Sequence, residues 1–166
     1  MWFPVLLLPL ANLITAAVMG TSVAVAYMMP STLLPLLPSA VVFILGAVTE
    51  ELFYRWFLLK KVFFETTKLK PILSILIVSA LFAAMHLWNL QTSPANLPVL
   101  LQVFFAFCFS VWAGAAVWRT DRILIPLIAH VLLNATAADA EIAWVSVLVS
   151  IAVLADGIWL MRGEKI

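Results

Sequence analysis

The stretch "TEELFYRWF", residues 49–57, places two glutamates and an arginine inside a run of otherwise mostly apolar side chains. The chain around it has 166 residues, of which 66% are hydrophobic and 10% charged, and its mean hydropathy is +1.17. Soluble domains carry about 25% charged residues, so this composition predicts a membrane protein. Charged side chains at membrane depth cost roughly 2.5–3.5 kcal/mol each on insertion scales. The three charges in this stretch therefore need partners or a function.

Long apolar segments run through the whole chain. Hydropathy predicts membrane-spanning helices near 3–28, 39–59, 71–90, 98–118, 123–138 and 143–161. These runs are continuous rather than alternating, which disfavours a β-barrel. We therefore expect an all-α fold, with residues 1–166 forming one polytopic membrane domain, a bundle of about six transmembrane helices. Between the first two spans, "PSTLLPLLPSA" contains three prolines and predicts a turn or an irregular segment.

Basic residues occur in alternate connections. They follow the second, fourth and sixth predicted spans, and are Lys60, Lys61, Lys68, Lys70, Arg119, Arg122, Arg162 and Lys165. The intervening connections contain no Lys or Arg. The positive-inside rule then predicts a protein integral to the cell membrane with both termini in the cytoplasm. A formal net charge of +1, without a basic face, argues against a nucleic-acid partner.

Helical spacing separates the three charges of the opening stretch. Residues four apart share a helix face, so Glu51 and Arg55 are expected to pair. Glu50 lies on another face together with Tyr54, and it remains available for chemistry or for a contact with another helix. An ion pair with a purely structural role is an alternative for Glu51 and Arg55.

Two further pairs of polar or aromatic residues occupy later spans. In "FAAMH", residues 82–86, an aromatic ring lies one helical turn before His86. In "HVLLN", residues 130–134, His130 and Asn134 place two hydrogen-bond donors on one face. Hydrogen bonds between helices explain the second pair nearly as well as a catalytic role does.

Together these residue types suffice for hydrolysis of an amide bond. Glu50 and His86 can hold and deprotonate a water, while His130 and Asn134 receive the negative charge on the carbonyl oxygen. No covalent nucleophile is then required. The chain has no G-x-S-x-G, and Cys108 has no histidine near it in sequence, so a serine or cysteine nucleophile has weak support.

A zinc site is an alternative reading of the same residues. Glu50, His86 and His130 have the ligand types of a two-histidine, one-glutamate zinc site. The motif H-E-x-x-H is absent, however, and zinc would leave Asn134 and Glu51 without a role. We therefore expect no metal and no cofactor. A rival from another class is a non-catalytic membrane immunity or binding protein that uses the same polar residues to hold a partner.

Taken in order, "EELFYR" at 50–55, "FAAMH" and "HVLLN" resemble the motifs EExxxR, FxxxH and HxxxN of the CAAX prenyl protease and bacteriocin-processing family, also called the Abi family. The resemblance covers a motif-bearing core at about 39–138. It implies an all-helical, glutamate-dependent and metal-independent intramembrane endopeptidase.

The resemblance also implies a role for each motif residue. Glu50 would be the water-activating base assisted by His86, and His130 with Asn134 would form the oxyanion site. Glu51 and Arg55 would be supporting groups. The substrate would be a membrane-associated or C-terminally processed peptide or protein. Its identity does not carry over, because bacterial relatives serve bacteriocin maturation or self-immunity, peptide signalling and sorting-tail processing. The short chain suggests a prokaryotic minimal form.

The depth of the predicted site can be counted along the helices. At about 1.5 Å per residue from the nearest cytoplasmic basic residue, His130 lies at ~12 Å, Glu50 at ~15 Å, Asn134 at ~18 Å and His86 at ~24 Å. Three of these depths agree, and they slightly favour a site that opens toward the cytoplasm over one reached from the middle of the bilayer.

Overall fold

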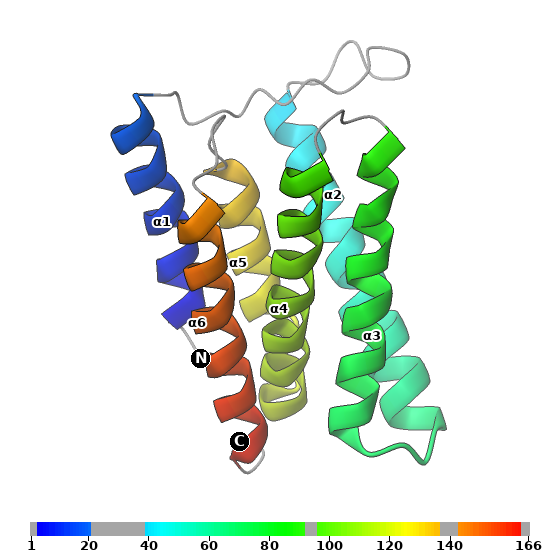
Figure 1. Ribbon diagram of the computed structural model, residues 1–166. Helices are drawn as coiled ribbons and strands as arrows, with labels where there is room; N and C mark the ends of the chain where they lie inside the picture. The colour runs from blue at the N-terminus through cyan, green and yellow to red at the C-terminus, as the bar shows by residue number, and fades with distance from the viewer. Residues whose placement is uncertain (1–2, 21–38, 92–95, 137–142, 164–166) are drawn as a thin grey trace.

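The computed structural model describes residues 3–20, 39–91, 96–136 and 143–163 (Figure 1). All regular secondary structure in these parts is helical, which confirms the predicted all-α class. The elements are α1 (Phe3–Met19), α2 (Ser39–Glu51), the π-helix η1 (Leu52–Phe64), α3 (Pro71–Met85), the 3-10 helix η2 (His86–Gln91), α4 (Asn96–Thr120), α5 (Leu124–Ala135) and α6 (Ala143–Arg162).

Three described helical segments are long and apolar enough to cross a membrane, namely Pro71–Gln91, Leu97–Thr120 and Ala143–Arg162. The apolar helices α1 and α5 are shorter. The continuous α2–η1 segment has sufficient length but carries the charges of the opening stretch. These features fit an integral membrane protein, and the total of about six spans stays a prediction.

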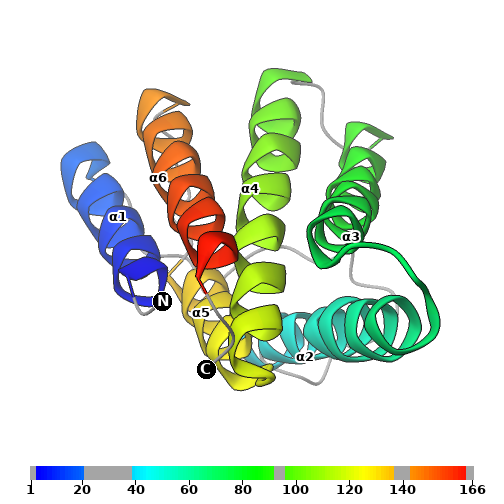
Figure 2. The same cartoon turned by 90° about the horizontal axis from the view of Figure 1, so that it is seen from below.

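Consecutive long helices run in opposite directions, so both chain ends lie at the same end of the bundle (Figure 1). Helices α1, α6, α4 and α3 stand side by side, with α5 and α2–η1 packed across one face of this row (Figure 2). The connections after η1 and after α4 lie at the end that holds the termini. We call this end the basic end, because the basic residues outside the helices gather there.

Local sequence signals set several helix limits. Gly20 takes φ 63°, the left-handed conformation that ends helices, so α1 stops at Met19 instead of reaching residue 28 as predicted. Residues 21–28, and the proline-rich stretch up to residue 38, lie outside the described residues. Pro71 begins α3 after an extended Lys70, since the first helical position needs no backbone N–H.

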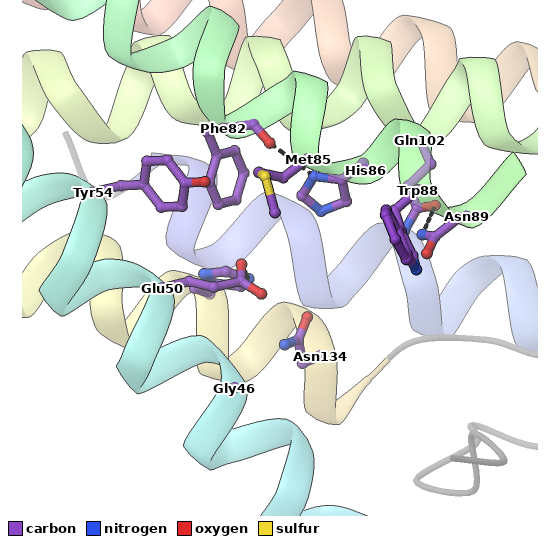
Figure 3. A pocket seen from close by; sticks show the side chains of 11 residues that line it. Gly46, Glu50, Tyr54, Phe82, Met85, His86, Trp88, Asn89, Gln102 and Asn134 are labelled. Atoms are coloured by element: carbon purple, nitrogen blue, oxygen red, sulfur yellow. Dashed lines mark hydrogen bonds and ion pairs between the residues drawn. The ribbon is translucent and has the colours of Figure 1, made fainter. Parts of the chain in front are cut away.

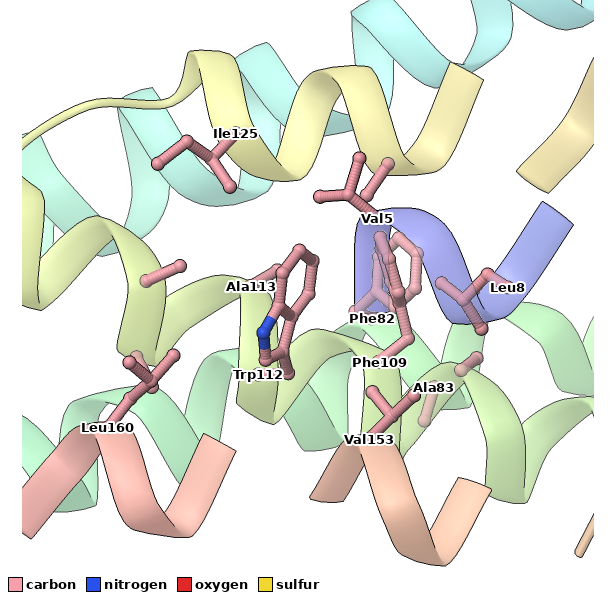
Figure 4. Packing of buried hydrophobic residues seen from close by; sticks show 14 residues of the cluster. Val5, Leu8, Phe82, Ala83, Phe109, Trp112, Ala113, Ile125, Val153 and Leu160 are labelled. Atoms are coloured by element: carbon pink, nitrogen blue, oxygen red, sulfur yellow. The ribbon is translucent and has the colours of Figure 1, made fainter. Parts of the chain in front are cut away.

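The centre of the bundle is α4. Its middle is fully buried, with small side chains that let neighbouring helices approach closely. Phe109 and Trp112 lie between α1 and α5 on one side and α6 on the other (Figure 4). The Trp112 indole N–H donates to Asp156 Oδ2 on α6 over 3.0 Å, which satisfies a carboxylate within the last apolar helix. Beside it, Gly157 packs directly on the Trp112 backbone.

Candidate active site

A pocket of about 570 Å³ brings together residues from α2, η1, α3, η2, α4 and α5. The residues predicted as catalytic, Glu50, His86, His130 and Asn134, all line it (Figure 3). The remaining lining residues are Gly46, Tyr54, Phe82, Met85, Trp88, Asn89 and Gln102. Residues from four separate parts of the sequence therefore share one cavity.

The supporting pair predicted from helical spacing is present beneath this pocket. Glu51 Oε2 lies 3.2 Å from Arg55 Nε, and both side chains are 0% exposed. The guanidinium carbon of Arg55 lies 4.3 Å from the centre of the Phe82 ring and 5.8 Å from that of Phe109. Because the Arg55 nitrogens lack well-aligned hydrogen bonds to described residues, the aromatic faces and the carboxylate are what stabilise its charge.

Glu51 has a second partner that the sequence did not predict. Its Oε1 lies 2.9 Å from His130 Nδ1, so one carboxylate links Arg55 on η1 to His130 on α5. An ionised carboxylate only accepts hydrogen bonds, so Nδ1 of His130 carries a hydrogen. The other ring nitrogen, Nε2, then lies 3.8 Å from Glu50 Oε2. Glu51 thus sets the orientation of His130 toward Glu50.

His86 is oriented by a change of helix type. Where α3 tightens into η2, the backbone N–H of His86 donates to the carbonyls of Ala83 and Ala84 instead of that of Phe82. The Phe82 carbonyl then accepts from His86 Nδ1 over 3.0 Å. A carbonyl can only accept, so Nδ1 carries the hydrogen. In the neutral ring Nε2 is left as an acceptor at the pocket (Figure 3).

Helix α1 hydrogen-bonds to the C-terminal end of α5. Asn12 Nδ2 lies 3.3 Å from both Leu133 O and Thr136 Oγ1, which satisfies groups of the last turn beside Asn134. Interhelical hydrogen bonds of this kind fix one membrane helix against another. Asn12 therefore contributes indirectly to the position of Asn134.

The rim of the pocket was missed by sequence reasoning. Asn89 Nδ2 donates to Gln102 Oε1 over 2.8 Å, and both side chains line the pocket. Met85 and Trp88 are 63% and 67% exposed. Met85, Trp88 and Asn89 are near His86 in the chain, and this adjacency was their only signal in the sequence. Gln102 belongs to another helix and had no such signal.

The pocket lies nearer one end of the bundle than the other. His86 begins η2, Asn134 is the residue before the last of α5, and Gln102 lies two turns into α4, so the pocket lies toward the bundle end opposite the basic end. The side of the membrane from which the site is reached stays a prediction.

The zinc alternative has no ligand cluster in the described ranges. Among those residues, no three or more His, Cys, Asp or Glu side chains are grouped so that they could hold a metal ion. Cys108 is buried on α4 and does not line the pocket.

Comparison with protein families gives a match over the part of the chain that forms this site. The model of the family described as type II CAAX prenyl endopeptidase Rce1-like matches residues 32–136, a range that contains all three motifs. No curated protein and no solved structure gave a significant match. The matched range is more than half of the chain, and its members are membrane endopeptidases that act on peptide or protein substrates. The chain therefore belongs to the type II CAAX prenyl endopeptidase Rce1-like family.

Proposed function

We propose that the protein is a glutamate-dependent intramembrane endopeptidase that hydrolyses a peptide bond of a membrane-associated peptide or protein. The observation that carries this proposal is the meeting of Glu50, His86, His130 and Asn134 in one pocket. Its supporting groups are Glu51 and Arg55. Both termini are cytoplasmic in this proposal, which the gathering of basic residues at the end holding the termini supports.

The first step activates a water. Glu50 has a 41% exposed side chain, and its carboxylate can accept one hydrogen of a water in the pocket. His86 Nε2 accepts the other, since Nδ1 is committed to Phe82 O. As the water oxygen attacks the carbonyl carbon, its proton passes to Glu50. Such general-base assistance contributes typically 10²–10⁴-fold to a rate.

The second step stabilises the oxyanion and releases the amine. The Asn134 amide donates to the oxyanion directly. His130 can donate from Nε2 only when its ring carries both protons, because Glu51 already holds the Nδ1 hydrogen. In that form, and before Glu50 takes the proton of the water, the charges of Glu50, Glu51, Arg55 and His130 sum to zero. Protonated Glu50 then gives its proton to the leaving nitrogen as the C–N bond breaks.

The proposal is tested with purified protein and a pool of membrane-anchored peptides, followed by mass spectrometry. Wild type should give fragments that a chelator does not abolish, and Glu50→Gln should give none. Glu65→Gln is the matched control, because Glu65 is a glutamate immediately after η1 that is 48% exposed and lies outside the pocket. Fragments from correctly folded Glu50→Gln at the wild-type level would contradict the proposal.

The same assay separates the alternatives. Activity that a chelator removes and zinc restores would favour a zinc-dependent protease. Peptide binding without any product from wild type would favour a non-catalytic immunity or binding protein.

A further inference from the structure

Charge is distributed very unevenly between the two ends of the bundle. Apart from Arg55, every described Lys and Arg lies at the basic end, in η1, in the last turn of α4 or α6, or in the connections after η1 and α4: Lys60, Lys61, Lys68, Lys70, Arg119, Arg122 and Arg162. In the sequence, residues 20–38, 92–95 and 136–142 contain no Lys or Arg, and their only charges are Asp139 and Glu141. The positive-inside rule places the basic end in the cytoplasm.

The pocket lies toward the opposite end, as His86 at the start of η2 and Asn134 near the end of α5 show. Two strongly exposed tryptophans mark the same end, Trp88 at 67% on the rim and Trp144 at 66% near the start of α6. Tryptophan is enriched at the level of the lipid headgroups. The rim of the pocket therefore lies near the non-cytoplasmic interface of the bilayer.

The α3 side of the pocket presents an apolar surface. Helix α3 packs against η1 and α4, whereas α2 packs against α5, so α2 and α3 line the pocket from two separate sides (Figure 3). On the α3 side the exposed surface is apolar, with Met85 at 63% and Trp88 at 67%. An apolar peptide segment fits such a rim without crossing a charged surface.

The polar groups of the rim are neutral. Asn89 and Gln102 form an amide pair over 2.8 Å, and no Lys or Arg occurs among the described residues that line the pocket. Amides can donate to and accept from an extended peptide backbone, which needs such partners in an apolar setting. A free terminal carboxylate would find no lysine or arginine among these described lining residues. The rim therefore suits an internal, uncharged stretch of peptide.

We propose that the pocket receives its substrate from the non-cytoplasmic side, as an extended apolar peptide segment at the outer interface of an exported or membrane-anchored polypeptide. This inference rests on the proposed protease function. It concerns the side of entry and the class of substrate, neither of which follows from the catalytic residues themselves.

Orientation is tested by cysteine labelling in right-side-out vesicles. The single native cysteine, Cys108, is 0% exposed and gives a low background. Gln91→Cys places a thiol at the exposed end of η2 beside the pocket, and Lys68→Cys places one in the exposed connection at the basic end. A membrane-impermeant maleimide should label Gln91→Cys in intact vesicles, and Lys68→Cys only after permeabilisation. The reverse pattern, or equal labelling of both, overturns the inference.

The side of entry is tested with two reporters that carry the same apolar cleavable segment on opposite faces of one membrane anchor. Wild type should cut the reporter whose segment lies outside, and Glu50→Gln should lose this product. Cutting of the inner reporter alone overturns the inference but leaves the proposed protease intact. If neither reporter is cut, the substrate class and the proposed protease both fail, while the labelling still decides the orientation.

Discussion

Glu51→Gln is the substitution that best separates the structural and chemical roles of the buried charges. Glu51 and Arg55 are both 0% exposed, with Oε2 and Nε 3.2 Å apart. At an effective dielectric constant of about 20, unit charges at this distance attract by about 5 kcal/mol. Neutralising Glu51 leaves the arginine buried without its counter-charge, which costs about 3–5 kcal/mol. At about 2–4 °C per kcal/mol, the expected fall in Tm is about 6–20 °C.

The matched control is Glu65→Gln. Glu65 forms an i,i+4 pair with Lys61 at 2.7 Å, but the two side chains are 48% and 43% exposed. Exposed pairs contribute about 0–1 kcal/mol, so this variant should unfold within about 4 °C of wild type. Thermal unfolding in detergent, followed by tryptophan fluorescence, measures both variants under the same conditions.

A double variant, Glu51→Gln with Arg55→Met, then isolates the chemistry. Removing both charges should recover most of the lost Tm, because the buried arginine no longer needs a partner. Peptide cleavage should stay at least about 10²-fold below wild type, because His130 has lost the charged acceptor at Nδ1. A wild-type Tm for Glu51→Gln, or full cleavage activity in the double variant, would refute the reasoning.

Two smaller effects follow from packing and surface charge. A Cβ at Gly157 would lie 2.8 Å from Trp112 Cα, so Gly157→Ala should destabilise the α4–α6 contact by about 1–3 kcal/mol. Gly46→Ala is the control and should not lower Tm, because a Cβ at Gly46 would have no atom within 4 Å. Lys60 Nζ lies 2.8 Å from Asp121 Oδ1 with the side chains 23% and 80% exposed, so Lys60→Ala should cost less than about 1 kcal/mol, and less still in high salt. Thermal unfolding measures all three variants, the last at two salt concentrations.

Sequence reasoning anticipated the helices well because hydropathy is a local property. The observed α3–η2, α4 and α6 segments agree with the predicted spans to within a few residues. The pairing of Glu51 with Arg55 was equally accessible, since it depends only on residues four apart on one helix. Both predictions needed nothing beyond short-range geometry.

Contacts between helices could not be predicted from the sequence in the same way. Lipid is as apolar as leucine, so the buried and lipid-facing sides of a membrane helix look alike in sequence. On α3, Ile75 is 1% exposed whereas Ile72 is 50% exposed, although the two residues are chemically identical. The rotation of each helix was therefore unknown. The link from Glu51 to His130 and the amide pair at the rim depend on that rotation.

Changes of helix type were also missed. The sequence predicted one regular helix through residues 39–59, but a π-helix begins directly after Glu51. π-helical turns are rare and frequent at functional sites. Likewise, the change from an α-helix to a 3-10 helix at His86 leaves no hydropathy signal. This change frees the Phe82 carbonyl to accept from the imidazole. These local departures determine how the two motif segments present their side chains.

The central claim is that Glu50 activates the attacking water, and the single-turnover cleavage rate of Glu50→Gln tests it most directly. With one peptide substrate in detergent, the variant should cleave at least about 10²-fold more slowly than wild type, with an unchanged Tm and with Glu65→Gln at the wild-type rate. Cleavage by folded Glu50→Gln at the wild-type rate would contradict the account.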